Sequence, residues 1–421
     1  MRLLFLVLFS FIFSVNGAYA QIVRPGWFVA ERGEEVIEDE NETATAIEGT
    51  EEEAVLNKDI PQTEAKEITS SMDKVRFIKG NKDLLWAKNF LRIEFEASKS
   101  KNIAVSPLSV YLSSVILANG VVDESLAEFS GMFSILHLGE VNRQIKEYVE
   151  DKQIFSFYTA LWGKQFSSRY EKLMKSLSGV EMWGIKDTTE QINNWANVRT
   201  KGSVLEIGEV KDVLDKEIYL SQVVQANLQW ENPFYEKNTQ KTVFHGLNGQ
   251  KSFVWMMNKV EKTDYYEDDE MQAIRLYAST GDYLVVLLPR EGVSFSEFVK
   301  NINISKLKPR FTQVVAVDIF LPRMSFNYTL SRPLKIFENL GVKRIFAKEN
   351  NDFAKMVNFD SPSVIKDVYL NTVISITDSK NVKENIDNGK PKNTIQFNAD
   401  RPFIFVINNG EFIGTFVSGY K

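Results

Sequence analysis

The order in which helix and strand signals occur is the strongest constraint on the fold of this chain. Residues 82–97 place apolar side chains at helical spacings, and a second apolar helix is predicted to begin at Pro107 with Ser106 as its N-cap. Segments rich in Val, Ile, Tyr and Phe predict strands over residues 154–162, 217–226, 283–288, 314–321, 369–376 and 403–407. Helices in the N-terminal third followed mainly by strands predict an α+β fold rather than a repeated βαβ fold.

The first twenty residues have the pattern of a secretory signal peptide. Arg2 precedes an apolar run that starts at Leu3, and residues 18–20 form an A-x-A cleavage site. The run is too short to cross a membrane comfortably, and no other segment reaches the length that a membrane span requires. We therefore expect cleavage before Gln21, no membrane span, and a secreted, extracellular protein.

Residues 21–72 form an acidic segment that is predicted to be disordered. They hold fourteen Asp and Glu against four Lys and Arg. With few large apolar residues and no sustained period, the segment cannot bury enough surface to offset the entropy of ordering it. The net charge of −6 therefore combines an acidic extension with a weakly basic body that begins near residue 73.

The residues that carry enzyme chemistry are scarce. The absence of cysteine excludes disulfides, thiolate metal sites and cysteine nucleophiles, and only His137 and His245 offer an imidazole. Nucleophile-elbow, P-loop, dinucleotide-binding and zinc-protease motifs are all missing, and the acidic residues 264–270 lack the glycine and spacing of a calcium loop, which predicts a solvated loop. We expect no enzyme activity, cofactor, metal or nucleic-acid partner, and a monomer. Glycosylation sequons occur at Asn41, Asn303 and Asn327.

Five or more sequence blocks, in order from about Phe77 to Lys421, are similar to those of one known protein family. They include the S-P-L-S signature at residues 106–109, the WENPF segment at residues 230–234 and the LPRMSF segment at residues 321–326. Two further blocks match at Ile192, Asn193, Trp195, Thr200, Gly202 and Val204, and at Arg401, Pro402, Phe403 and Gly419. These blocks resemble the serpin family. The resemblance implies a serpin domain over residues 73–421, with three β-sheets, eight or nine helices and an exposed reactive loop near the C-terminus.

Inhibitory serpins act as suicide substrates, because the cleaved reactive loop inserts into the large sheet as a new strand. The hinge before the loop must bend, and here the resemblance breaks down. Ile374 and Ile376 stand where the family has glutamate and glycine, Thr377 is retained, and Ser379, Lys380 and Asn381 replace alanines. Because β-branched residues are stiff, we expect this segment to continue its strand rather than to hinge.

The resemblance also assigns the region at which the large sheet opens. It places Ser106, Ser109, Gln222 and Lys366 there, with Gln222 and Lys366 in the positions of a family Asn and His, and it assigns Trp195 to the breach, where opening starts. The usual Asn–His hydrogen bonds therefore cannot form, although other polar residues could replace them.

The best candidate for a reactive bond is Lys390-Pro391, in a segment that reads as an exposed turn. Lysine suits a trypsin-like protease, whereas proline after it disfavours cleavage. The leading hypothesis is a secreted serpin-fold protein that is not a suicide inhibitor and that binds or modulates an unidentified extracellular ligand or receptor. The alternatives are a suicide inhibitor of a trypsin-like serine protease that uses Lys390, and a reversible inhibitor that presents its loop without insertion.

Overall fold

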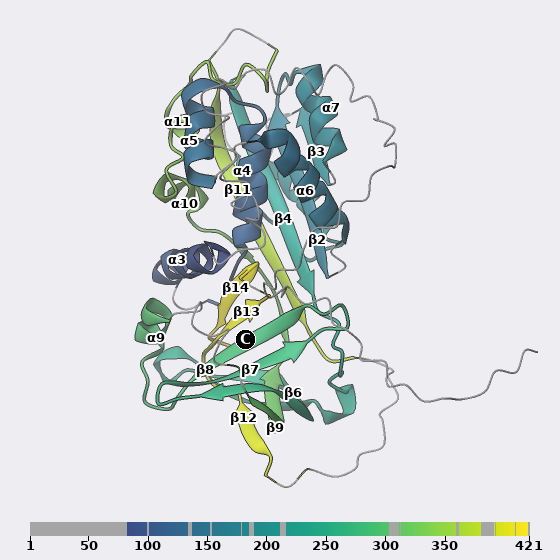
Figure 1. Ribbon diagram of the computed structural model, residues 1–421, viewed down its shortest axis with the longest axis vertical. Helices are drawn as coiled ribbons and strands as arrows, with labels where there is room; N and C mark the ends of the chain where they lie inside the picture. The colour runs from purple at the N-terminus through teal and green to yellow at the C-terminus, as the bar shows by residue number, and fades with distance from the viewer. Residues whose placement is uncertain are drawn as a thin grey trace, which may run out of the picture. The chain divides into compact units, whose positions relative to one another are not determined.

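The computed structural model in Figure 1 describes residues 82–98, 101–133, 137–151, 154–177, 179–184, 189–210, 216–302, 311, 313–358, 362–379, 391, 393–408 and 410–419. The predicted signal peptide, the acidic extension, Asn41 and Asn303 lie outside these residues. So do Lys380, Asn381 and Lys390.

The helices gather in the first half of the described chain. They are α3 (Lys82–Ala97), α4 (Pro107–Ala118), α5 (Asp123–Phe133), α6 (Leu138–Asp151), α7 (Ser168–Ser176), α8 (Thr189–Arg199), α9 (Phe295–Asn301), α10 (Pro333–Asn339) and α11 (Arg344–Ala347). The predicted helix over residues 82–97 is confirmed, and so is the start of α4, where the Ser106 side chain accepts a hydrogen bond from the Ser109 N–H at 3.1 Å. In the described part of the chain, no helix is long and apolar enough to cross a membrane.

Strands supply most of the remaining regular structure, which makes the fold α+β as predicted. They are β1 (Ile103–Val105), β2 (Phe155–Gly163), β3 (Val180–Gly184), β4 (Glu217–Asn227), β5 (Gln240–His245), β6 (Lys251–Glu267), β7 (Met271–Tyr277), β8 (Tyr283–Pro289), β9 (Gln313–Pro322), β10 (Met324–Thr329), β11 (Val364–Ile376), β12 (Ile395–Asn398), β13 (Phe403–Ile407) and β14 (Phe412–Phe416).

Five of these strands form one sheet in the order β10-β11-β4-β2-β3. Strands β11 and β4 are parallel and remain paired from Val364 opposite Glu217 to Ser375 opposite Asn227, with one irregularity between Ile365 and Asp367. We call this β4–β11 pairing the seam. It leaves no gap between the two strands along its whole length.

The other strands form a second sheet in the order β1-β14-β13-β8-β7-β6-β9-β12, with β5 beside β6. The family resemblance implied three sheets, but hydrogen bonds join the described strands into two. The cause is β6, whose first residues pair with β5 while its last residues pair with β7, and which pairs with β9 between them. One long strand therefore connects what would otherwise be two separate sheets.

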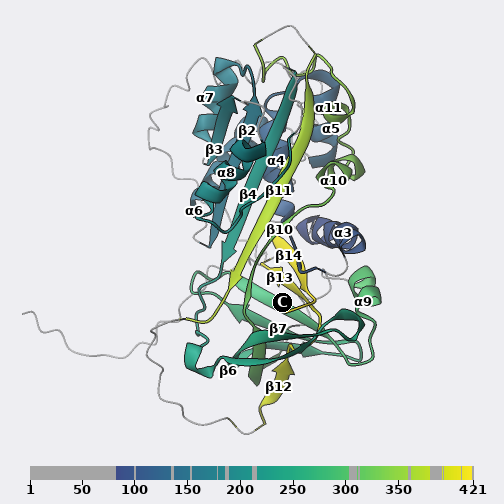
Figure 2. The same ribbon diagram turned by 180° about the vertical axis from the view of Figure 1, so that it is seen from behind.

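Alternate residues of the seam face two different cores. Leu220 and Val224 of β4 and Ile374 of β11 lie in the main core with α4, every residue of which is buried. Val223 and Val373, on the opposite face, lie in a smaller core with α8. Figures 1 and 2 show α4 and α8 on opposite sides of the five-stranded sheet. Because successive side chains of a strand point to opposite faces, the seam packs against a helix on each face of the sheet.

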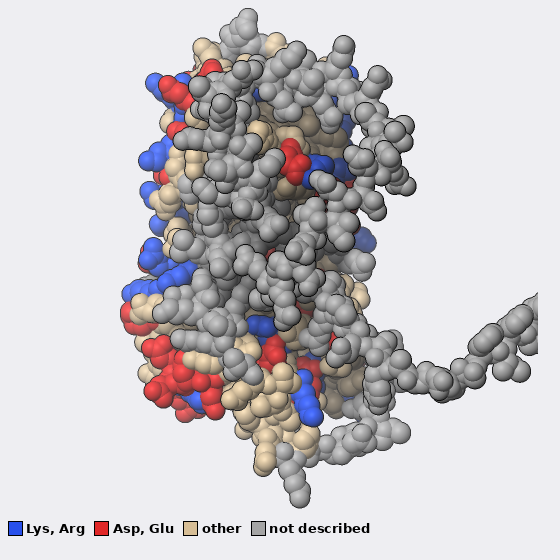
Figure 3. All heavy atoms as spheres, viewed as in Figure 1, with Lys and Arg blue, Asp and Glu red and all other residues tan. Residues whose placement is uncertain are grey.

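Acidic side chains gather at the turn between β6 and β7, visible as a cluster of carboxylates in Figure 3. The prediction of a loop over residues 264–270 was wrong for its first four residues, because β6 continues to Glu267 and pairs with β7. Hydrogen bonds from the Tyr265 hydroxyl and from Arg290 hold the pKa of Glu267 below its usual range. Cross-strand pairing thus outweighs the low strand propensity of an acidic segment.

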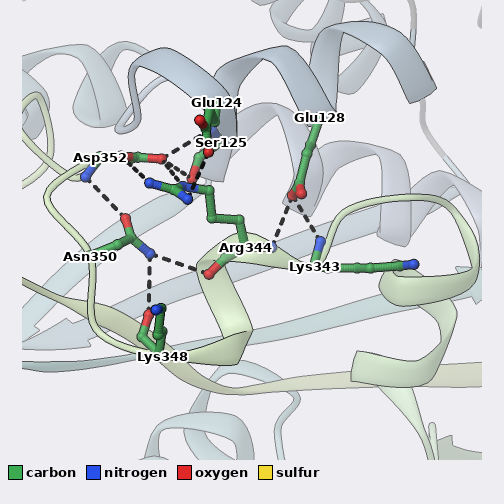
Figure 4. Close-up of polar contacts among 8 residues, drawn as sticks. All are labelled: Glu124, Ser125, Glu128, Lys343, Arg344, Lys348, Asn350 and Asp352. Carbon is green, nitrogen blue, oxygen red and sulfur yellow. Dashed lines mark hydrogen bonds and ion pairs between the residues drawn. The ribbon is translucent and has the colours of Figure 1, made fainter.

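A polar network ties α5 to the segment around α11 (Figure 4). Arg344 lies 2.6 Å from a buried oxygen of Asp352 and 2.7 Å from the exposed carboxylate of Glu124. The same Asp352 oxygen accepts hydrogen bonds from the backbone N–H and the hydroxyl of Ser125, and Glu128 accepts from two backbone N–H groups at the start of α11. Although burial opposes ionisation of Asp352, the Arg344 and Ser125 bonds outweigh it and lower the pKa of this carboxyl.

Replacing Asp352 with Asn tests this network. We expect the free energy of unfolding at pH 7 to fall by about 1.5–3 kcal/mol, because charge-assisted hydrogen bonds are lost. A carboxyl whose pKa is depressed in the folded state stabilises the fold above its unfolded pKa, near 4, and loses that contribution as the pH falls through its folded pKa. The difference between wild type and Asp352→Asn in urea unfolding should therefore shrink below about pH 4.

The matched control is Glu124→Gln, which removes the other carboxylate bound to the same arginine. Since this side chain is 76% exposed, we expect a loss below about 0.5 kcal/mol. Equal losses in the two variants, or a difference from wild type that does not change between pH 7 and pH 3, would contradict this account.

Candidate functional site

The candidate site is the end of β11 and the three residues that follow it, Thr377–Ser379, which we call the stem. The chain after the stem leads to the predicted reactive bond. Thr377 and Ser379 are half-buried and Asp378 is buried, so the stem is packed against the body.

The hinge residues lie inside the strand. Ile374 pairs with Ala226 of β4 and Phe326 of β10, and Ile376 pairs with Met324 of β10. Both isoleucine side chains have no exposed surface. The strand therefore continues through the position at which the resemblance places a flexible hinge.

Asp378 is the most strongly bound residue of the stem. One of its carboxylate oxygens accepts hydrogen bonds from Nε and Nη2 of Arg323, at 3.0 and 2.5 Å, and from the Thr239 hydroxyl at 2.5 Å. The carboxylate side chain is 2% exposed and the arginine side chain 23%. Arg323 lies between β9 and β10, where its guanidinium is 5.7 Å from the ring of Trp255. This buried ion pair attaches the stem to the second sheet.

The backbone of the stem is held as well. The indole N–H of Trp230 donates to the carbonyl oxygen of Thr377 at 2.9 Å, and the N–H of Ser379 donates to the carbonyl oxygen of Phe234, also at 2.9 Å. A bridge pairs Ser379 with Tyr235. Each stem residue is therefore bonded to the segment that follows β4.

A buried lysine contacts the segment that follows β4. Lys259 of β6 donates to the carbonyl oxygen of Asn232 at 2.6 Å and lies 2.9 Å from the Glu261 carboxylate and 4.3 Å from the ring of Phe234. Burial lowers the pKa of Lys259, while Glu261 opposes that shift. The carbonyl and ring contacts fix the segment that holds the stem.

The structure brings together three of the four residues assigned to the sheet-opening region. The Ser109 hydroxyl donates to the side-chain oxygen of Gln222, whose amide nitrogen donates to the Thr159 hydroxyl at 2.9 Å, and Ser106 caps the same helix turn. Lys366 does not join them. It is 54% exposed and binds Glu217 at 2.8 Å, which raises its pKa.

The register of the seam keeps Lys366 away from Gln222. Leu370 lies opposite Gln222, and Lys366 lies nearer the start of β11, at the irregularity between Ile365 and Asp367. Asn371, which follows Leu370, is buried on the opposite face and donates to the Thr329 hydroxyl at 2.7 Å. The polar contacts of the seam thus differ from the Asn–His arrangement of the family.

Trp195, which the resemblance assigns to the breach, is not part of either sheet. It lies on α8, where its ring is 6.0 Å from that of Trp162 in an edge-to-face arrangement. Trp230 contacts the end of β11 instead, and sequence reasoning missed it. The signal was present, because Trp230 follows β4, and strands that run parallel end at the same edge of a sheet.

Two other residues that the sequence singled out lie on the surface. Pro391 is exposed, and Asn327 is exposed on β10, where its side-chain amide donates to the carbonyl oxygen of Ser203 at 2.8 Å. Within the described residues, no three acidic or histidine side chains are grouped so that they could hold a metal ion.

Comparisons with known proteins point to one family. A family model described as Serpin (serine protease inhibitor) matches residues 87–418. The Mus musculus protein Serpin B11 is 28% identical over 308 residues, which are 67% of this chain and 76% of the relative.

Solved structures agree with this match. Native protease nexin-1 with heparin is 17% identical with a TM-score of 0.68, over 80% of this chain and 99% of that chain. Human thyroxine-binding globulin complexed with its hormone is 19% identical with a TM-score of 0.68, over 80% and 98% of the two chains. At these identities the likeness shows the fold alone.

Replacing Asp378 with Asn tests the attachment of the stem. The neutral amide cannot replace the ion pair with Arg323, so we expect the free energy of unfolding to fall by about 1.5–3 kcal/mol. The amide hydrogen of Ser379 should exchange with solvent faster, because the stem opens more often.

Glu236→Gln is the matched control, since its carboxylate lies 3.7 Å from the same arginine but is 55% exposed. We expect stability within about 0.5 kcal/mol of wild type and unchanged exchange at Ser379. If Asp378→Asn also left exchange at Ser379 unchanged, the ion pair would not be what holds the stem.

Proposed function

The chain belongs to the serpin family of serine protease inhibitors, a family of inhibitors rather than enzymes, and from this premise we propose that it is a secreted, extracellular serpin that does not trap proteases by strand insertion. In this proposal it binds or modulates an extracellular partner. The observation that carries the proposal is the buried and anchored end of β11.

Suicide inhibition requires the cleaved loop to enter the large sheet. In this chain the new strand would enter the seam, because β4 and β11 are the parallel neighbours inside the five-stranded sheet. The chain would then have to turn back at the end of β11, within or just after the hinge residues. Any contact that holds the end of β11 in place slows insertion. Slow insertion allows the acyl-enzyme to hydrolyse and release an active protease.

The two hinge isoleucines oppose such a turn. Ile374 and Ile376 are fully buried within β11, and a turn at this position would pull them from the core. Burial of an Ile side chain contributes about 1.5–3 kcal/mol, so withdrawing both is costly. A glycine at the second position would leave no side chain to withdraw.

The Asp378–Arg323 ion pair opposes insertion in a second way. Asp378 would have to leave both Arg323 and the Thr239 hydroxyl before the stem could move into the seam. Separating a buried ion pair costs about 3–5 kcal/mol. The lower end applies here, because Arg323 is partly exposed and keeps the Glu236 carboxylate at 3.7 Å.

The segment that follows α8 adds a third obstacle. Residues 200–210, which we call the crossing segment, lie against β10 and β11. The Tyr369 hydroxyl donates to the Glu209 carbonyl oxygen at 2.7 Å, and Asn327 donates to the Ser203 carbonyl oxygen. Opening the seam moves β11 relative to this segment and disturbs both bonds.

A second candidate function is suicide inhibition of a trypsin-like protease at Lys390. The direction of the strands favours it, because a strand that returns from β11 would pair antiparallel with both β4 and β11. Two antiparallel ladders would then replace one parallel ladder, and antiparallel pairing is slightly more stable per residue. Pro391, the neighbour of Lys390, is exposed, as a protease-accessible bond requires.

Limited digestion with trypsin distinguishes the two functions. Once the loop has been cut, we expect the melting temperature of the noncovalent product to stay within about 5 °C of the intact protein, because the freed strand does not enter the sheet. Incubation with active trypsin should give no complex that survives SDS.

The control is the Lys390→Ala variant, treated in the same way. A rise of melting temperature well beyond 5 °C on cleavage, together with an SDS-stable complex that is lost in Lys390→Ala, would overturn the proposal and establish the second function. Inhibition of trypsin without an SDS-stable complex would instead support presentation of the loop without insertion, which is compatible with a non-trapping serpin.

A further inference from the structure

An open cavity of about 490 Å³ lies beside β11, close to its start and far along the strand from the stem. Three segments line it: residues 207–208 of the crossing segment, residues 329–335 at the junction of β10 and α10, and residues 367–369 of β11. Figure 2 shows α10 and β10 next to β11 on this side of the sheet. No stem residue is among the described residues of this lining.

One part of the cavity lining carries a carboxylate that forms no ion pair among the described residues. The irregularity in β11 turns Lys366 outward to Glu217, whereas Asp367 is half-buried and lines the cavity. The Asp367 carboxylate accepts a hydrogen bond from the Val368 N–H at 2.8 Å. Burial raises the pKa of Asp367, although the hydrogen bonds of Val368 and Tyr369 and the charge of Lys366 oppose that shift. A bound cation would stabilise its ionised form.

Another segment of the lining carries positive charge. Arg332 and Lys335 both line the cavity. The backbone N–H of Arg332 donates to buried Glu94 at 3.4 Å, which fixes the chain at this point, but in the described structure its guanidinium has no ion-pair partner. Lys335 has one exposed partner, Glu338, at 3.5 Å. Neither cation lies within 4 Å of Asp367, so the opposite charges face one cavity without pairing.

The rest of the lining is partly apolar. It includes Ile207, Leu330, Leu334 and Val368. The ring of Tyr369 packs against Gly208 so closely that a Cβ on Gly208 would lie 2.4 Å from ring carbons. Absence of a side chain at this residue therefore keeps the crossing segment close to β11. The volume is in the range of small-molecule sites, which combine an apolar lining with a few placed polar groups.

We propose that this cavity binds a small zwitterion with a flat apolar body, whose ammonium group binds Asp367 and whose carboxylate binds Arg332, with Lys335 at the same end. Such a molecule carries one group for each of the two kinds of charge in the lining. It contacts the crossing segment, β11 and the start of α10 together, and so it stabilises the closed sheet. The proposal is independent of whether the reactive loop inserts.

The test uses 4-(aminomethyl)benzoate as the probe, with benzylamine and benzoate as matched compounds that each lack one charge. Binding to the full chain is measured by calorimetry at low ionic strength, where exposed charges are least screened. We expect the zwitterion to bind at least about tenfold more tightly than either single-charge compound. It should also raise the melting temperature, because it binds only the folded protein.

Two variants test which residue binds each charged group of the probe. Asp367→Asn should lower the affinity for the zwitterion about tenfold and leave that for benzoate unchanged. Arg332→Gln should lower the affinities for the zwitterion and for benzoate and leave the affinity for benzylamine unchanged. Arg143→Gln, which alters an exposed arginine of α6, is the control and should change neither affinity.

Equal binding of the three compounds, no binding of the probe, or wild-type affinity in both variants would overturn the proposal. If Asp367→Asn failed to fold, Arg332→Gln would still decide the matter, because its exposed side chain holds no described partner. A loss of zwitterion affinity in that variant supports the site, and an unchanged affinity contradicts it.

Discussion

The seam between β4 and β11 is the constraint on which the rest of the structure depends. Its parallel register determines which residues of both strands face α4 and which face α8. A slip of one residue would exchange Ile374 for Val373 and reverse the two faces. Both cores therefore require the same register, and the polar contacts of Gln222 and Asn371 fall on opposite faces for the same reason. The packing of α4 and α8 on its two faces therefore holds the sheet closed independently of the stem.

Much of the fold could be predicted from the sequence, because apolar periodicity and capping act locally. The α3 limits, the start of α4 and the strand over residues 403–407 match the structure, as does the α+β class. Sequence reasoning failed where a residue's position depends on pairing between distant strands. Lys366 was assigned to the sheet-opening region by the family resemblance, whereas the register of β11 against β4 places Leu370 opposite Gln222. The length of β6 and the merging of two sheets were missed for the same reason.

The stem shows the same limit at the candidate site. The sequence indicated that Ile374 and Ile376 would prolong a strand, and β11 does include them. Nothing in the sequence marked Asp378 or Arg323 as partners, because they are far apart in the chain and each stands among ordinary polar residues. Trp230 could have been found, since the tryptophan that follows β4 must lie near the end of a parallel neighbour. Trp195, in a motif of equal strength, lies on a helix across the sheet face.

The anchored stem also bears on how the reactive segment can change over evolutionary time. One end of that segment is tied at Ser379, and the other begins at Ile395, which pairs with Val317 in the second sheet. Because both attachment points belong to the folded body, residues between them can be inserted, deleted or exchanged without altering either sheet. Doubling the length of a flexible connection costs only about 0.6 kcal/mol in closure entropy. The body can therefore carry recognition sequences of different length and composition while its own folding stays nearly constant.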